Sequence, residues 1–248
     1  MMTVYNTTEE LEAAKVDTAI LPIGAIEQHG PHLPLATDLI NAEEMAKRVA
    51  EMIGNCYLLP ALPFSNSQEH LDFTGTVTLK PSTLALVLRD IVLSLYLQGI
   101  KKIIIIQGHG GNWIVKPTLR ELNLEYPDLK VIHSGPMAGE NLDRHAGEFE
   151  TSRMLYLRRD LVKTDKIVDC LPGVTGEYMD YVGMKTLSEH GPWGRASRGT
   201  PEKGEKSVKE SVERTVQYIY QTFKKLEELE HTAPERRSIT PKPPAPDR

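Results

Sequence analysis

The chain has 248 residues, of which 40% are hydrophobic and 25% are charged, the balance of an ordinary folded domain and not of a disordered, collagen-like or disulfide-stapled protein. Its formal net charge of −5 has the wrong sign for a protein that binds nucleic-acid phosphates. Two cysteines, no visible export signal and no long uncharged apolar stretch predict a cytoplasmic protein that does not enter the membrane.

The arrangement of apolar residues predicts strands that alternate with helices. Short aliphatic runs predict buried strands at 18–23, 57–62, 102–107 and 129–133. Apolar residues at three- and four-residue steps predict amphipathic helices at 41–53, 81–98, 113–125 and 148–159. Asn41 is expected to cap the first of these helices, and Pro81 suits the first turn of the second. The alternation predicts an α/β fold with a mainly parallel sheet covered by helices on both faces.

A long, charged helix is predicted at 202–231. Its apolar side chains form one stripe, which is expected to pack against the rest of the domain: Val208, Val212, Val216, Ile219, Phe223 and Leu226. The residues after it, 232–248, contain five prolines and are expected to form a flexible tail. No Pro- or Gly-rich linker divides residues 1–231, which are therefore expected to form a single domain.

Acidic and histidine side chains concentrate after predicted strands, which is where open α/β sheets bind ligands. The first such segment is GAIEQHGPHLPLATD. In an extended segment Glu27 and His29 point to the same side, because they are two residues apart. Asp38 follows nine residues later, after a Pro-rich loop that can fold it back. One carboxylate and one imidazole are therefore expected to reach one centre or two adjacent ones.

Two further segments carry the same residue types. QGHGGN places His109 between glycines at a strand-to-helix turn, with Asn112 expected to cap the next helix. A phosphate-binding loop is an alternative for QGHGGN, although the segment lacks the G-x-G-x-x-G spacing. RHAGEFETS opens another helix with His145, Glu148 and Glu150. Taken alone, the two glutamates are explained by the favourable interaction of acidic side chains with a helix N-terminus.

Together these segments supply a mixed set of nitrogen and oxygen ligands: Glu27, His29, Asp38, His109 and Glu150. Such a set suits Zn, Mn or Fe in a catalytic site with open positions, and it contains no thiolate. Five ligands exceed what one catalytic zinc uses, so a two-ion centre is predicted, with Asp38 between the ions and a shared water held as hydroxide. His145 is then expected to move the proton. The residues by themselves predict a metal-assisted hydrolase.

At these motifs the sequence resembles the creatininase (creatinine amidohydrolase) family. The resemblance covers about residues 18–229 and is carried by LPIGAIEQHGPHLPLATD, QGHGGN, HAGEFETS and RASRGTPEKGE in this order. It implies a three-layer αβα sandwich, two divalent metal ions (Zn, Mn or Fe), and a homo-oligomer that is often a hexamer. It implies that His145 contacts the substrate and moves the proton. By motif, it assigns one ion to Glu27, Asp38 and His109 and the other to His29, Asp38 and Glu150.

Two departures from the pattern of creatininases proper concern the substrate. Those enzymes have a glutamate where this chain has Gly111, and a Trp-Asp pair where it has Asn141 and Leu142. Creatinine is therefore not the expected substrate, and Glu148, one turn from His145, is a candidate for the missing acid. The expected function is hydrolysis of a non-peptide C–N bond, in a small cyclic amide or a formamide.

The resemblance leaves other functions open. One is the removal of formate from a formamidopyrimidine ribonucleotide phosphate in flavin and deazaflavin biosynthesis. Others are a peptidase that trims a redox-cofactor precursor and a hydrolase that opens an oxidised inositol ring. A non-catalytic binding protein on the same fold is a competing class. In all of these the expected partner is a small molecule or short precursor, with no nucleic acid and no membrane.

Further side chains are candidates for substrate binding. Ser67, Glu69 and His70 follow the second predicted strand. Arg195, with Arg198, either clamps a phosphate or carboxylate or lies on the surface. Trp193 either stacks on a substrate or anchors a loop. The sequence offers no means of choosing between these pairs of roles.

Overall fold

The structure is a computed structural model that describes residues 1–134 and 143–230. At its centre lies a five-stranded sheet with the strand order β1-β3-β2-β4-β5, in which all neighbouring strands are parallel. The parallel sheet is the predicted one. Its strands are β1 (Met2–Thr3), β2 (Thr18–Ile23), β3 (Tyr57–Leu58), β4 (Lys102–Gln107) and β5 (Lys130–Ser134).

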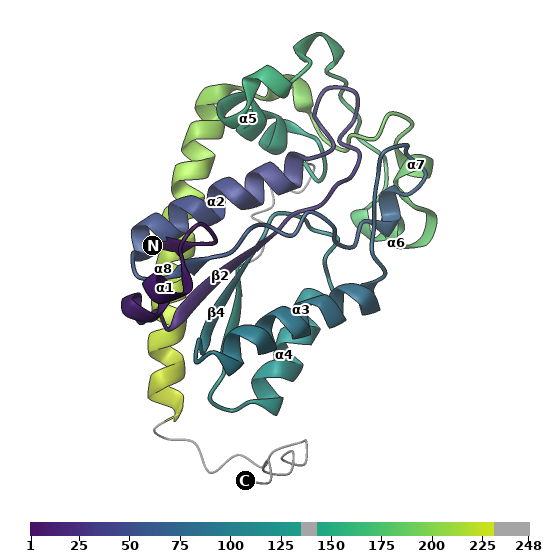
Figure 1. The fold of residues 1–248 in the computed structure, drawn as a ribbon. Helices are drawn as coiled ribbons and strands as arrows, with labels where there is room; N and C mark the ends of the chain where they lie inside the picture. The colour runs from purple at the N-terminus through teal and green to yellow at the C-terminus, as the bar shows by residue number, and fades with distance from the viewer. Residues whose placement is uncertain (135–142, 231–248) are drawn as a thin grey trace.

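Helices cover both faces of this sheet, with α3 and α4 on one side and α2 and α8 on the other (Figure 1). The described α-helices are α1 (Thr8–Ala14), α2 (Thr37–Ile53), α3 (Pro81–Leu97), α4 (Val115–Glu125), α5 (Glu148–Leu157), α6 (Met179–Val182), α7 (Met184–Leu187) and α8 (Pro201–Glu230). Short 3₁₀ turns are η1 (Gln68–His70), η2 (Arg159–Leu161), η3 (Thr164–Lys166), η4 (Gly176–Tyr178) and η5 (Ala196–Arg198).

The alternation of side chains along β4 divides the core into two halves. Ile103 and Ile105 pack with the buried faces of α3 and α4, whereas Ile104 and Ile106 pack with those of α2 and α8. All four isoleucines are at most 4% exposed. Burial on both faces explains why this strand is an unbroken aliphatic run. The three-layer αβα sandwich is confirmed.

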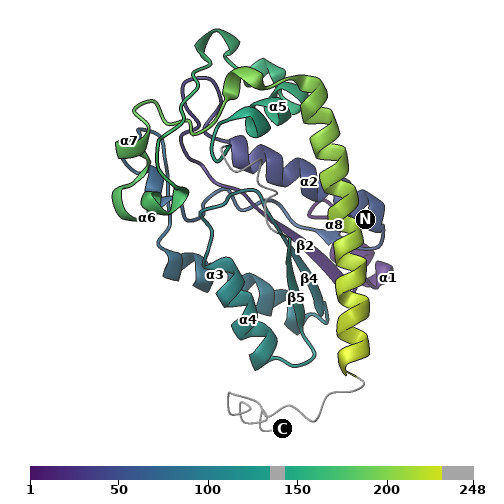
Figure 2. The ribbon, with the colours of Figure 1, turned by 180° about the vertical axis from the view of Figure 1, so that it is seen from behind.

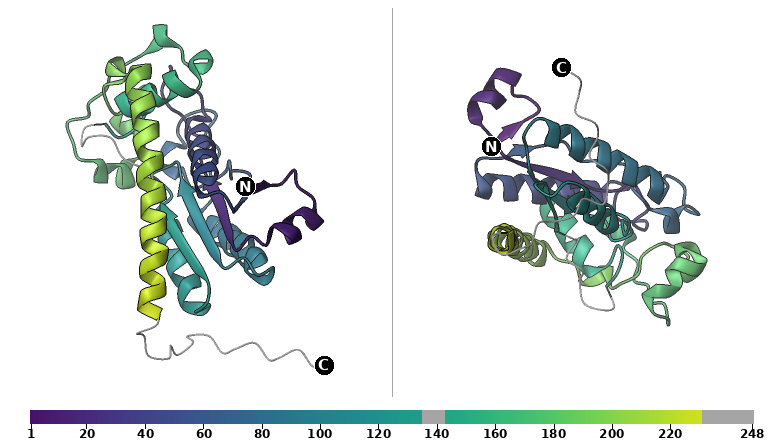
Figure 3. Two further views of the ribbon diagram at one scale, coloured as in Figure 1. Left: turned by 90° about the vertical axis from the view of Figure 1, so that its left-hand side faces the viewer. Right: turned by 90° about the horizontal axis from the view of Figure 1, so that it is seen from below.

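The long helix α8 packs against α5, α2 and strand β5 (Figure 2). The predicted stripe is the buried face: Val208, Val212, Val216, Ile219 and Phe223 are at most 9% exposed, and Leu226 packs partly buried against the same cluster. The side view in Figure 3 shows α8 extending past the ends of the strands to reach α5. One helix therefore joins the sheet to the segment that carries Glu150.

Three predicted boundaries are wrong. The strand predicted at 57–62 forms a ladder only at Tyr57–Leu58, because Pro60 has no N–H to donate to a neighbouring strand. Helix α2 begins at Thr37, so Asn41 lies inside it and donates to the Thr37 carbonyl over 3.0 Å. Asn112 does not cap α4 and instead accepts the N–H of Asn66 at 2.9 Å.

Some predictions concern residues outside the described part of the chain. Asn141, Leu142 and the tail 232–248 lie there. Within residues 1–134 and 143–230, no helix is both long and apolar enough to span a lipid bilayer.

Candidate metal centre

Close packing of α2 against the ends of β2 and β4 places Asp38. The carboxylate lies in the first turn of the helix, where the helix dipole favours a negative charge. A β-carbon on Gly24, after β2, would overlap the backbone of Leu39, and one on Gly108, after β4, would overlap the carbonyl oxygen of Asp38. These two glycines let the first turn of α2 approach both strand ends.

Side chains from the ends of β2 and β4 and from α2 and α5 meet in one buried cluster. Three groups have ligand atoms that all lie within 4.8 Å of one another: Glu27, Asp38 and His109; His29, Asp38 and Glu150; and Glu27, His29 and His145. The first two are the ligand sets that the sequence predicted. Asp38 belongs to both.

Distances within the cluster place the Asp38 carboxylate between two histidines. Its Oδ1 lies 3.3 Å from His29 Nε2, and its Oδ2 lies 3.1 Å from His109 Nδ1. Beyond them, His29 Nε2 lies 3.6 Å from Glu150 Oε2, and His109 Nε2 lies 3.2 Å from Glu27 Oε2. This is the arrangement in which two divalent ions could share one carboxylate.

Several polar atoms of the cluster are buried without a hydrogen bond among the described residues. They are Glu27 Oε1 and Oε2, His29 Nε2 and Asp38 Oδ2. Buried polar groups are nearly always paired, because leaving them unpaired costs free energy. Metal ions would satisfy these atoms, and carboxylates with imidazoles are ligands that Zn²⁺ and Mn²⁺ accept. The residues therefore fit a metal site.

Neighbouring carboxylates change the pKa of the two histidines. Burial disfavours the charged form of His29, but the charges of Asp38 and Glu150 outweigh burial and raise its pKa to about 10. Burial acts in the same direction on His109, and Glu27 and Asp38 outweigh it, so its pKa lies well above the usual range. Burial raises the pKa of Glu150 to about 7. Without metal, protons on the histidines balance part of the negative charge.

His145 stacks beside the cluster in a neutral form. Its ring centroid lies 4.2 Å from that of His29 and 4.3 Å from that of His70. The Gln28 carbonyl lies 2.7 Å from His145 Nε2 and can only accept, which assigns the ring proton to Nε2 and leaves Nδ1 facing Glu27 Oε1 at 3.6 Å. Burial and the charge of His29 hold the pKa of His145 well below its usual range.

The backbone next to His145 is strained. Ala146 has a φ of 50°, in the left-handed region that is costly for a residue with a side chain. The Ala146 N–H donates to Glu150 Oε2 over 2.5 Å. The backbone N–H of Trp193 donates to the backbone carbonyl of His145 over 2.7 Å. These contacts orient His145 and Glu150 together.

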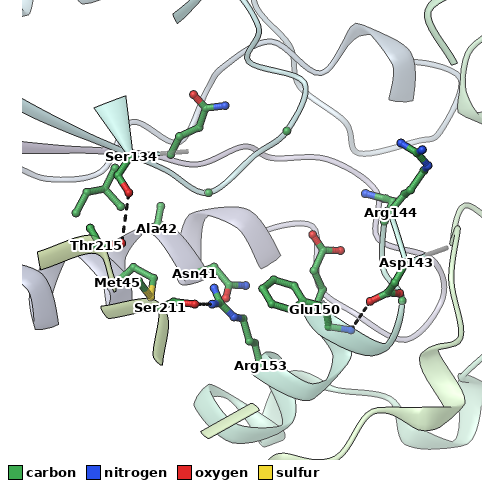
Figure 4. A pocket seen from close by; sticks show the side chains of 17 residues that line it. Asn41, Ala42, Met45, Ser134, Asp143, Arg144, Glu150, Arg153, Ser211 and Thr215 are labelled. Carbon is green, nitrogen blue, oxygen red and sulfur yellow. Dashed lines mark hydrogen bonds between the residues drawn. The ribbon is translucent and has the colours of Figure 1, made fainter. Parts of the chain in front are cut away.

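The start of α5 is fixed by a carboxylate outside the helix. Asp143 accepts the N–H groups of Glu148 and Phe149 over 2.7 and 2.6 Å. A cavity of about 130 Å³ separates parts of α2, α5 and α8 (Figure 4). Beside it, the buried Arg153 of α5 donates to Ser211 Oγ of α8 over 2.6 Å (Figure 4). The helix that carries Glu150 is thus held at its beginning and along its side.

The three candidates from SQEH all lie at the cluster. Ser67 Oγ lies 3.4 Å and Glu69 Oε1 3.6 Å from His109 Nε2. His70 Nε2 lies 3.6 Å from Glu27 Oε1. The histidine of QGHGGN faces the carboxylates of Glu27 and Asp38, as expected of a metal ligand and not of a phosphate-binding loop.

A cavity of about 850 Å³ opens beside the cluster and is lined by Glu69, His70, His109, His145 and Glu150 among others. The lining residues that sequence reasoning missed include Arg144, Trp113 and Tyr181. Trp113 is 62% and Tyr181 80% exposed. Two of these residues could have been found from their neighbours in the sequence, because Trp113 directly follows QGHGGN and Arg144 directly precedes His145. Gln28, which lies between Glu27 and His29, was also missed.

Three predicted site residues are part of neither the cluster nor the lining of this cavity. Glu148 lies two residues from Glu150, which is about 200° of helix rotation, so its side chain leaves α5 on another side. There its carboxylate forms an ion pair with Lys203 Nζ at 2.7 Å. Trp193 is 2% exposed and anchors the backbone of His145, so of its two possible roles the structure supports the anchor. Arg195 precedes η5 and is not among the residues that line the cavity.

A parallel α/β sandwich with a carboxylate–histidine cluster at its strand ends is the architecture of a metal-dependent hydrolase. Residues 5–219 match the family model described as creatinine amidohydrolase. The mycofactocin precursor peptide peptidase of Mycolicibacterium smegmatis is 32% identical over 84% of this chain and 85% of its own. The creatinine amidohydrolase of Pseudomonas putida is 30% identical over 82% of this chain and 89% of its own.

Solved creatininase structures have the same fold. A manganese form superposes with a TM-score of 0.76 at 29% identity, covering 90% of this chain and 98% of the other. A Zn–Zn form of a mutant creatininase superposes with a TM-score of 0.75 at 29% identity, covering 89% and 98%. The chain belongs to the creatininase family and is a hydrolase that acts on carbon–nitrogen bonds.

Proposed function

We propose that this protein hydrolyses a carbon–nitrogen bond of a small cyclic amide or formamide at a centre of two divalent ions. The observation that carries the proposal is the position of Asp38, whose two oxygens face His29 and His109 at 3.3 and 3.1 Å. A carboxylate placed in this way could serve two divalent ions at once. Retention of all five predicted ligands also argues against a non-catalytic binding protein.

Divalent ions at such a centre polarise a carbonyl oxygen and lower the pKa of water. The chain's own residues would do the rest. Neutral His145 has its Nδ1 on the side of Glu27 and can accept a proton there and return it to the leaving nitrogen. Gln28 orients the ring of His145 through its carbonyl. The mouth of the cavity, with Trp113, exposes an aromatic surface to the substrate.

A short peptide is the second candidate substrate. The cavity of about 850 Å³ has room for more than a single small ring, and Tyr181 lines its entrance while 80% exposed. The relative at 32% identity is named as a peptidase of a precursor peptide. This candidate keeps the same centre and the same role for His145.

The test is a substrate panel assayed with protein loaded with Mn²⁺ or Zn²⁺. The panel contains creatinine and other cyclic amides, a formamidopyrimidine phosphate, and short peptides, with ring opening, formate and new amino groups as readouts. We expect turnover in the cyclic-amide or formamide group, and turnover of the peptides alone would establish the second candidate.

Two variants serve as controls. Asp38→Asn should lower the turnover by at least about a hundredfold, because both ions lose a ligand. Glu148→Gln should retain it, because that carboxylate pairs with Lys203. Full turnover by the Asp38 variant, or in the presence of a strong chelator, would contradict the proposal.

A further inference from the structure

The Glu69 carboxylate lies at the cluster but belongs to none of the predicted ligand sets. It comes from η1, which is separate from the strand ends and from α2 and α5. Its side chain is 16% exposed, and its Oε1 lies 3.6 Å from His109 Nε2. Among the described residues, no lysine or arginine forms an ion pair with it. The cationic partner of Glu69 in the metal-free protein is the protonated His109 ring, and a metal ion bound to His109 would replace that positive charge.

The space beside Gly111 shows how closely Glu69 approaches the ring of His109, although Glu69 is in none of the three groups whose ligand atoms all lie within 4.8 Å of one another. A β-carbon at position 111 would overlap both Glu69 Oε1 and the ring of His109. The Glu69 carboxylate therefore fills the volume into which a side chain on the loop after β4 would project. Position 111 of this chain has no acidic side chain, and the carboxylate of Glu69 from η1 occupies the space beside it.

The charges of the cluster support the same assignment. Four carboxylates surround the histidines: Glu27, Asp38, Glu69 and Glu150. Within the described ranges, none of them pairs with a lysine or arginine. Two divalent ions carry enough positive charge to balance all four carboxylates once the histidines are neutral. Among the described residues, both carboxylate oxygens of Glu27 are buried and without a hydrogen bond, as expected of a ligand of the same ion.

We propose that Glu69 is a further metal-binding residue, whose carboxylate contributes to the ion held by Glu27, Asp38 and His109. The inference rests on the proposed two-ion centre. It makes that ion's environment three carboxylates and one imidazole, against two carboxylates and one imidazole for the other ion. Carboxylates suit Mn²⁺ and imidazole suits Zn²⁺, so Glu69 gives this position its preference for manganese.

The experiment titrates Mn²⁺ and Zn²⁺ into metal-free full-length protein by calorimetry. Wild type is expected to bind two ions. Glu69→Gln should weaken Mn²⁺ binding at one position by at least about tenfold, weaken Zn²⁺ less, and leave the other position unchanged. In the metal-free state the same variant should melt no lower than wild type, because it removes one of four mutually repelling charges. A residue with a merely structural role would instead lower that melting temperature.

Asp180→Asn is the matched control. Asp180 lines the same cavity and is exposed, so its replacement removes one charge near the entrance without touching His109. It should leave both affinities within about twofold of wild type. Two bound ions with equal Mn²⁺ affinity in wild type and Glu69→Gln would overturn this inference and leave the proposed function standing. Equal losses in the Asp180 and Glu69 variants would also overturn it. Failure of wild type to bind any ion would overturn the proposed function itself.

Discussion

His29 and His109 are the residues at which metal binding and protonation compete. The pKa of His29 is raised to about 10, and that of His109 lies well above its usual range, because carboxylates surround both rings. A metal ligand must be neutral imidazole. Each ion therefore has to displace a proton that the metal-free protein holds at neutral pH.

This competition predicts that metal affinity rises with pH. Near pH 8 both histidines of the metal-free protein are protonated and Glu150 is largely ionised, so binding two ions should release about two protons. Below pH 7 the release should be larger, because the pKa of Glu150 is raised to about 7. Calorimetry in buffers of different protonation enthalpy measures the number directly. An affinity that does not change with pH would contradict the assignment of these histidines as ligands.

His32→Gln is the control for that measurement. His32 is buried, and burial together with the charge of His29 lowers its pKa to about 4, so it carries no proton to release at pH 7. Its Nε2 contacts Thr151 Oγ1 at 2.9 Å and is not part of any ligand group. The number of protons released by the variant should equal that of wild type.

At the scale of elements, the contact between α5 and α8 controls the position of Glu150. Gly204 of α8 is buried against α5, where a β-carbon would overlap the carbonyl oxygen of Ser152 and lie 2.9 Å from Tyr156 Cβ. Arg153 adds hydrogen bonds to Ser211 across the same contact. The position of Glu150 therefore depends on the close approach of these two helices, although none of the residues at their contact would touch an ion.

Gly204→Ala should destabilise the protein, although replacing a helical glycine by alanine usually stabilises a helix. Alanine normally stabilises a helix interior by up to about 1 kcal/mol. Here the backbone contact must open, and we expect a loss of about 1–3 kcal/mol in the free energy of unfolding. Urea denaturation of the metal-free protein measures it. Because α5 would shift, the ion held through Glu150 should also bind more weakly, and a stabilised variant would contradict this account of the packing.

Glu205→Ala is the matched control on the same turn of α8. Glu205 is exposed, so its replacement should change the free energy of unfolding by no more than about 0.5 kcal/mol. Metal affinity should not change.

At the scale of the whole molecule, the centre depends on segments that are far apart in sequence. Glu27 and Glu150 are separated by more than a hundred positions, and the sheet with its two helical layers brings them together. Four carboxylates at one edge of the sheet repel one another when no metal is present. The homo-oligomer and the cytoplasmic location implied by the sequence stay predictions.

Metal should therefore stabilise the entire fold. At a free concentration one hundred times the Kd, one ion adds about 2.7 kcal/mol to the free energy of unfolding. For a chain of this length that corresponds to a rise in Tm of roughly 5–10 °C. Differential scanning calorimetry with Mn²⁺, Zn²⁺ and a chelator tests this, and Asp38→Asn should remove most of the rise. No change in Tm on adding metal would contradict a metal centre held by the native fold.

The sequence by itself determined the layered fold and the set of ligands. Strand β4 could be predicted because KIIIIQ contains an unbroken run of isoleucines, and α8 because its apolar stripe repeats at helical spacing. Glu27 and His29 could be paired because side chains two apart in an extended segment share a side. These are local patterns, which depend on residues that are neighbours along the chain.

Only the tertiary structure decided which of several acids face the centre. Glu148 and Glu150 are glutamates in the same helical turn, and the sequence does not distinguish their roles. In the structure the turn of α5 directs Glu148 to Lys203 and Glu150 to His29. Glu69 reaches His109 from forty positions away, because η1 packs beside the loop after β4 where Gly111 leaves room. A side chain's direction and the space that it fills depend on packing between distant segments, and no spacing along the chain encodes them.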